Sequence, residues 1–200
     1  WTEDAVDMVG SHFELDGATC LPKPLQRPHP PIWIGANADP AIERAAHMGD
    51  CWYINPHNAI STVIRQMDVY KRALDAAGKP FPDELPMRRE VFVAPTKAEA
   101  LRLCGPYLAG KYENYTDWGQ SDELPDDDSK LDQAFGDLIG DRFLLGSPDE
   151  VAEQIIDLHR QVGTNHLIMS MDWAGMPKEA TLDCMRLFAE EVAPKVRSGL

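Results

Sequence analysis

Four short apolar runs alternate along the sequence with segments of helical periodicity, and this order constrains the fold more than any other feature. The runs lie near 31–36, 50–55, 89–94 and 166–171. Strands joined by helical segments of this length need crossover connections, which pair the strands in parallel. The sequence therefore predicts an α/β fold. Because a (β/α)8 barrel contains eight such units in about 250 residues, four units predict the second half of a TIM barrel or a small open sheet.

Residues that start or stop regular structure set the expected boundaries. Asp39, Asn58, Thr96 and Ser147 each precede a segment with helical spacing, so we predict that they cap helices. Thr96 and Ser147 are each followed three residues later by glutamate, which is the spacing of a capping box. The last helix is expected over 178–196.

Two segments fall outside the alternating series. Upstream, Ser11–Leu21 predicts a hairpin that turns at Asp16-Gly17, because this dipeptide favours two-residue turns. Farther on, 117–140 is acidic, contains proline and is weakly periodic, which predicts a mobile insertion. Its run Asp126-Asp127-Asp128 lacks the spacing of an EF-hand calcium loop, so we interpret it as a solvated acidic loop without a ligand.

Charge and composition argue against two classes of partner. A net charge of -14 opposes binding to nucleic acid, because that affinity depends mainly on lysine and arginine at phosphates. No apolar run approaches the roughly 20 residues that cross a bilayer, so a membrane is not an expected partner. The four cysteines stand far apart, which predicts isolated buried thiols and no metal site: Cys20, Cys51, Cys104 and Cys184.

The start of the sequence indicates where the protein is located and whether the chain is part of a longer one. The first residue is Trp1, and 1–10 lack the basic and apolar regions of a signal peptide. We therefore expect a cytoplasmic protein whose first half is missing from this chain.

The turn after the first apolar run has the character of an anion site. Gly35, Ala36 and Ala38 lack bulk, and a helix with Pro40 in its first turn follows. The N–H groups of that turn favour an anion, and the helix dipole adds roughly 0.3–1 kcal/mol. As an N-cap, however, the carboxylate of Asp39 would satisfy the same donors and repel a phosphate. An ordinary capped connection is therefore the alternative interpretation.

Several segments in this order resemble the bacterial luciferase-like flavin-dependent monooxygenases. The resemblance covers nearly the whole chain and is specific as an ensemble, although no single segment would suffice. The segments that carry it are Gly10–Leu15, Pro22–Gly35, Ala45–Asp50, Gly146–Ala152 and Gly163–Ile168.

The resemblance implies a TIM barrel of which residues 1–200 form the C-terminal portion, as a single luciferase-like domain with strands five to eight. It implies reduced FMN or a deazaflavin coenzyme as cofactor, and a homodimer. The cofactor phosphate would bind at Gly35, Ala36, Asn37, Ala38 and Asp39. Ala41 stands where some members have a hydroxyl side chain, so binding here would depend on backbone donors.

Barrel enzymes carry their chemistry at the C-terminal ends of the strands. Asn55 and His57 follow the second predicted strand, and we predict that they are catalytic. His57 could donate a proton or a hydrogen bond, since an imidazole titrates near neutral pH. The alternative is a turn before a helix whose polar groups satisfy the backbone. Met171 and Trp173 follow the last strand and are candidates for an apolar wall over the cofactor ring, or for core packing.

These observations favour a flavin-dependent oxidoreductase that monooxygenates a small organic substrate with reduced FMN and O2. A flavin reductase that supplies the reduced FMN is the expected protein partner. Deazaflavin-dependent hydride transfer is one alternative, because both cofactors carry a phosphate. A non-catalytic half barrel is the other, because four units leave exposed sheet edges and an open apolar face.

Overall fold

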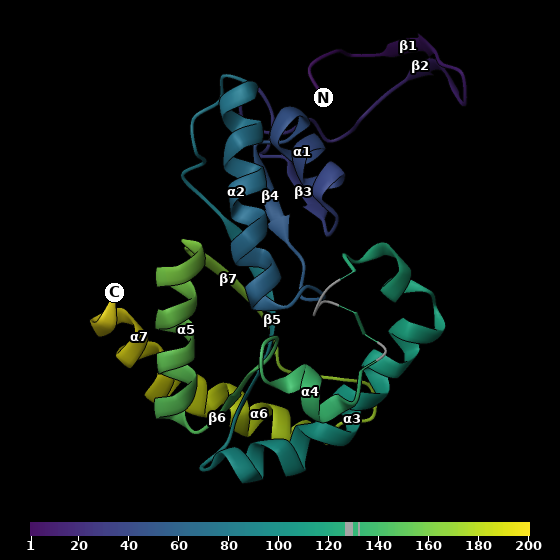
Figure 1. Ribbon diagram of the computed structural model, residues 1–200. Coiled ribbons are helices and arrows are strands. Elements are labelled where there is room, and N and C mark those ends of the chain that lie inside the picture. The colour runs from purple at the N-terminus through teal and green to yellow at the C-terminus, as the bar shows by residue number, and fades with distance from the viewer. Residues whose placement is uncertain (127–129, 132) are drawn as a thin grey trace. The chain divides into compact units, whose positions relative to one another are not determined.

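The computed structural model describes residues 1–126, 130–131 and 133–200 (Figure 1). The chain divides into two compact units, Trp1–Ile32 and Trp33–Leu200. Each unit has its own sheet.

The N-terminal unit contains an antiparallel hairpin of β1 (Val6–Val9) and β2 (Glu14–Ala18). The turn between the strands is closed by a hydrogen bond from the Gly10 N–H to the carbonyl oxygen of Phe13, at 2.9 Å. The prediction that the chain turns at Asp16-Gly17 is therefore wrong, because Gly17 lies inside β2. Its φ of +58° accompanies a shift of register, so the Asp-Gly pair forms a bulge rather than a turn.

The second unit contains a parallel sheet, as predicted. Every strand pair within it is parallel: β3 with β4, β4 with β5, and β5 with both β6 and β7. The four predicted strands are all present, and β6 is an addition. The strands are β3 (Trp33–Ala36), β4 (Cys51–Ile54), β5 (Pro86–Val93), β6 (Leu144–Gly146) and β7 (His166–Ser170).

Helices follow the strands of the sheet (Figure 1). The last predicted helix is interrupted by a π-helical turn, Phe188–Val192, between α6 and α7. A short 3-10 helix, Gln120–Glu123, follows α3. The helices are α1 (Asp39–Met48), α2 (Ile60–Ala76), α3 (Lys97–Asp117), α4 (Phe135–Ile139), α5 (Pro148–Val162), α6 (Lys178–Leu187) and α7 (Ala193–Gly199).

Two of the four predicted caps are confirmed. Ser147 forms a complete capping box at α5, and the Thr96 hydroxyl accepts from the N–H of Glu99 at 3.2 Å. The predictions for Asp39 and Asn58 are wrong, because Ala38 and Ala59 precede α1 and α2 and no described side chain caps either helix. Asp39 and Asn58 instead bind distant segments, which outweighs their local capping preference.

One face of the sheet is packed against helices and forms the core. On β4, Trp52 is fully buried, and its backbone N–H donates to the hydroxyl of Tyr70 on α2 at 3.1 Å. Consecutive strand residues point to opposite faces, so Tyr53 lies on the other face, together with Trp33. Their rings stack with centroids 6.4 Å apart, and Trp33 is 36% exposed. The second face of this half sheet is therefore open at β3.

The acidic segment is more structured than expected. Leu124, Leu131 and Leu138 are buried in the core of the second unit. This burial corrects the prediction of a mobile insertion for the described part of 117–140. Asp127 and Asp128 lie outside the described residues, so the interpretation of that acidic run stays a prediction.

The cysteines are free, as predicted for isolated thiols. Cys51, Cys104 and Cys184 are buried, and burial raises the pKa of each thiol, to about 11, 12 and 11 respectively. Cys20 is exposed, so the prediction of burial is wrong for this residue. Across the described residues, every helix is too short or too polar to cross a membrane.

Candidate functional site

The loop after β3 is held in place by side-chain amides. Asn55 Nδ2 donates to Asn37 Oδ1 at 3.1 Å. The carbonyl oxygen of Asn37 accepts from Asn58 Nδ2 at 2.9 Å and from Gln66 Nε2 at 2.7 Å. A Cβ at Gly35 would lie 3.4 Å from Asn55 Nδ2. The predicted phosphate loop and the predicted catalytic residue Asn55 are therefore neighbours, joined by a hydrogen bond.

The carboxylate of Asp39 is bound by side chains of α2 and does not cap its own helix. Its Oδ2 lies 2.7 Å from Arg65 Nη1, and its Oδ1 accepts from Arg65 Nη2 at 3.2 Å and from Gln66 Nε2 at 3.1 Å. The hydrogen bond from Arg65 lowers the pKa of Asp39. Because the negative charge is matched by Arg65, it opposes an anion at this loop less than an unpaired carboxylate would. In the first turn of α1, the N–H groups of Ala41 and Ile42 donate to the carbonyl oxygen of Ala38, at 2.9 and 3.0 Å, and Pro40 has no N–H. An anion would therefore depend on backbone donors that precede Ala41.

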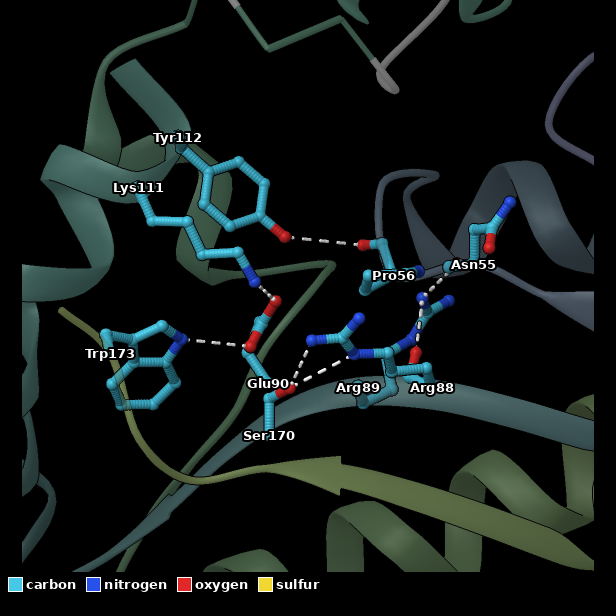
Figure 2. Close-up of polar contacts among 9 residues, drawn as sticks. All are labelled: Asn55, Pro56, Arg88, Arg89, Glu90, Lys111, Tyr112, Ser170 and Trp173. Carbon is cyan, nitrogen blue, oxygen red and sulfur yellow. Dashed lines mark hydrogen bonds and ion pairs between the residues drawn. The ribbon is translucent and has the colours of Figure 1, made fainter. Parts of the chain in front are cut away.

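A second cluster of polar side chains connects β5, α3 and the segment after β7 (Figure 2). Glu90 on β5 is completely buried and accepts from Lys111 Nζ on α3. Its Oε2 accepts from the indole Nε1 of Trp173 at 3.1 Å. Lys111 Nζ also lies 5.2 Å from the ring centroid of Tyr115. A buried charge is tolerated when it is paired and hydrogen-bonded, and both conditions are met here.

Two consecutive arginines on β5 have different surroundings. Arg88 donates from Nε and Nη2 to the Ser170 hydroxyl, at 3.1 and 2.7 Å. Arg89 is completely buried and donates from Nη1 to the carbonyl oxygen of Asn55 at 2.9 Å (Figure 2). Burial lowers the pKa of Arg89 to about 10, so the group is still charged near neutral pH. Among the described residues, Nε and Nη2 of Arg89 have no hydrogen-bond partner.

His57 lies among these cations. Burial is the main cause that lowers its pKa to about 4, and the charges of Lys111, Arg88 and Arg142 act in the same direction. Its ring meets Tyr115 edge-on, with centroids 5.0 Å apart. The imidazole is therefore neutral near pH 7, where it can donate or accept a hydrogen bond. The protonated form that would act as the predicted proton donor is scarce at that pH.

A cavity of about 510 Å³ lies between α3 and the segment after β7. Arg88 and Lys111 contribute charged groups to its wall, and Tyr115, Trp118 and Trp173 contribute aromatic rings. Trp173 therefore lines a pocket, which is one of the roles predicted for it. Met171 instead packs against the hydrophobic core.

The charged residues of β5 and α3 were not predicted from the sequence. Arg88 and Glu90 are separated by one residue in a strand, so they share a face. This spacing was the available signal, but the strand was expected to start at 89 and in fact starts at Pro86. Lys111 carried no local signal, because its role depends on where α3 lies relative to β5.

Comparisons with known proteins agree with this architecture. A family model described as luciferase-like monooxygenase matches residues 1–165. The FMNH2-dependent dimethylsulfone monooxygenase of Pseudomonas putida is 28% identical over 183 residues, which are 85% of this chain and 49% of that protein.

Solved structures also resemble this chain. Monooxygenase RslO1 from Streptomyces bottropensis superimposes with a TM-score of 0.70 at 26% identity, over 97% of this chain and 56% of that one. An F420-dependent secondary alcohol dehydrogenase superimposes with a TM-score of 0.69 at 19% identity, over 98% of this chain and 57% of that one, which shows a shared fold. The chain spans about half the length of the relatives it matches.

Proposed function

Because this chain belongs to the luciferase-like monooxygenase family, we propose that it supplies the C-terminal half of a flavin-dependent monooxygenase. The reaction is the insertion of oxygen from O2 into a small organic substrate, with reduced FMN as cofactor. The FMNH2-dependent relative supports this choice of cofactor. A homodimer and a flavin reductase that supplies reduced FMN are parts of the same proposal.

One observation carries the proposal: the helix after β3 begins without a side-chain cap among the described residues, and its first residue, Asp39, is paired with Arg65. A parallel strand that ends in front of such a helix presents backbone N–H groups to a phosphate. The exposed Gly35 lets a ligand approach the backbone closely. These residues fit the phosphate end of a flavin mononucleotide.

In this proposal Gly35, Ala36, Asn37, Ala38 and Asp39 form the phosphate loop, and Asn55 holds it through Asn37. The bound flavin supplies the redox chemistry, while the protein orients it and excludes water. Neutral His57 lies behind Tyr115 of the cavity wall, and in this proposal it offers a hydrogen bond to the bound cofactor.

Deazaflavin-dependent hydride transfer is the second candidate, favoured by the structural likeness to an F420-dependent dehydrogenase. A non-catalytic half barrel is the third, favoured by the open sheet face at Trp33. Oxygen consumption by the loaded protein separates the first two candidates, and cofactor binding separates both from the third.

The test compares FMN with riboflavin, which lacks the phosphate, in titrations of the full-length protein of which this chain is the proposed C-terminal half, and of its Gly35→Val variant. Valine at this position crowds both Asn55 and the ligand, so we expect a loss of FMN affinity that is several times the loss for riboflavin. Gly136→Ala is the matched control, because a Cβ at Gly136 meets nothing within 4 Å. Equal losses for both ligands, or no loss for either, would refute the phosphate loop.

A further inference from the structure

The cavity between α3 and the segment after β7 combines an aromatic wall with two cations. Its volume of about 510 Å³ is within the usual range for small-molecule sites. Tyr115 and Trp118 on α3 and Trp173 after β7 supply flat apolar surfaces. The charged groups that reach it from β5 and α3 are Arg88 and Lys111. A ligand for this cavity needs an apolar body and a group that can pair with a cation.

The two cations differ in how they are neutralised. Lys111 is paired with the buried carboxylate of Glu90. Arg88 has only a neutral side-chain partner among the described residues, the Ser170 hydroxyl. That hydroxyl takes the edge of the guanidinium formed by Nε and Nη2 and fixes its orientation. The Nη1 edge is left to a ligand. Arg88 is therefore a positioned cation whose charge is not matched.

The carboxylates near this cavity already have partners. Asp172 also lines the cavity, but it is exposed and accepts a hydrogen bond from the Thr181 hydroxyl at 3.0 Å. The carboxylate of Glu90 is paired with Lys111 and accepts from the indole of Trp173. Arg88 therefore lines the cavity as a cation without a carboxylate partner among the described residues, and it favours an anion at this place.

We propose that this cavity binds an organic anion with a planar apolar body, such as an aryl carboxylate or sulfonate. The charged group pairs with the Nη1 edge of Arg88, because a guanidinium matches the geometry of such oxyanions. The body packs on the rings of Tyr115 and Trp118. The assignment of this anion as the substrate rests on the proposed function, but its binding can be measured without flavin.

A pair of probes of equal shape tests the charge requirement. The probes are 3-phenylpropanoate and its neutral amide, 3-phenylpropanamide, titrated into the flavin-free chain. The indole N–H signals of Trp118 and Trp173, assigned by replacing each with phenylalanine, report occupancy by NMR. We expect the anion to bind roughly tenfold more tightly than the amide, as for one charge-assisted hydrogen-bonded pair.

Three variants identify the source of that preference. Arg88→Gln is expected to abolish the preference and to leave the amide affinity within about twofold. Arg88→Lys keeps the charge and should retain part of the preference. Arg102→Gln removes an exposed cation elsewhere, with a side chain 69% exposed, and should change nothing. Dispersed NMR spectra of each variant confirm that it is folded.

Several results would overturn the inference. These are equal affinities for the two probes in the unmodified chain, no binding of either, or an equal loss of both in Arg88→Gln. Titrations of FMN and riboflavin with Arg88→Gln form a separate arm. If Arg88→Gln lowers the affinity for FMN more than the affinity for riboflavin, the cavity binds the flavin phosphate and the proposed substrate is wrong. The probe result is independent of the Gly35 variant, so the two proposals can fail separately.

Discussion

Asp39 and Arg65 form a bidentate ion pair, with Oδ2 2.7 Å from Nη1 and Oδ1 3.2 Å from Nη2. The pair matches the negative charge of the carboxylate with a cation on α2. A residue that from sequence alone would oppose an anion at this loop therefore opposes it less in the folded chain.

The first prediction concerns the charge of Asp39. Asp39→Asn removes a negative charge near the proposed phosphate and leaves Arg65 close by. At an effective dielectric near 20 and a separation of several ångströms, the gain is about 1 kcal/mol, or about fivefold in FMN affinity. Riboflavin affinity should not change. Fluorescence titration with both ligands measures this, and a parallel gain for riboflavin would contradict it.

The second prediction concerns the buried pair of Glu90 and Lys111. Lys111→Met leaves the carboxylate buried without its partner, which should lower the free energy of unfolding by about 3–5 kcal/mol. Urea denaturation checks the value. The double variant Glu90→Gln with Lys111→Met should recover part of the loss, because no isolated charge is left in the interior. A double variant no more stable than Lys111→Met would argue against this origin.

The third prediction follows from the pKa of His57. The unfolded chain takes up a proton on this residue below about pH 6.5, whereas the folded protein does so only near pH 4, where its pKa of about 4 lies. The unfolded state therefore binds more protons between these values, and folding stability falls as the pH is lowered through this window. The loss from this residue at pH 5 is about 2 kcal/mol.

Chemical denaturation at pH 7 and pH 5 measures this dependence. His57→Gln should show a smaller loss of stability between the two values than the unmodified chain. His47→Gln, at an exposed histidine, serves as the control and should lose as much as the unmodified chain. The same loss in all three proteins would mean that His57 does not titrate as described.

The fourth prediction concerns the cap of α5. Ser147 donates to Glu150 Oε2 at 2.8 Å and accepts from its N–H at 3.4 Å. Ser147→Ala should lower the free energy of unfolding by about 1 kcal/mol. Asn58→Ala provides the contrast, because this residue does not cap α2. The Asn58→Ala variant should also bind FMN more weakly, since the amide of Asn58 donates to the carbonyl oxygen of Asn37. FMN affinity that is unchanged in Asn58→Ala would exclude that supporting role.

Local patterns in the sequence predicted much of the fold. The strands were found because each is a short apolar run before a segment with helical spacing, and Thr96 and Ser147 capped helices as expected because a cap depends on residues three positions apart. Asp39 and Asn58 have the same preference, but partners on α2, 26 and 8 residues farther along the chain, compete for their side chains. Local reasoning fails where a distant partner binds more strongly than the neighbouring backbone.

The sequence by itself determined the alternation of strands and helices, the glycine-bounded loop after β3 and the family resemblance, because each depends on residues that are close along the chain. Only the tertiary structure decided that Lys111 meets Glu90, 21 residues away, that Trp173 joins them from 83 residues away, and that Arg88 is left with a hydroxyl as its side-chain partner among the described residues. The physical reason is that an ion pair and a buried hydrogen bond depend on distances of about 3 Å, which are set by how helices pack on a sheet and not by spacing along the chain.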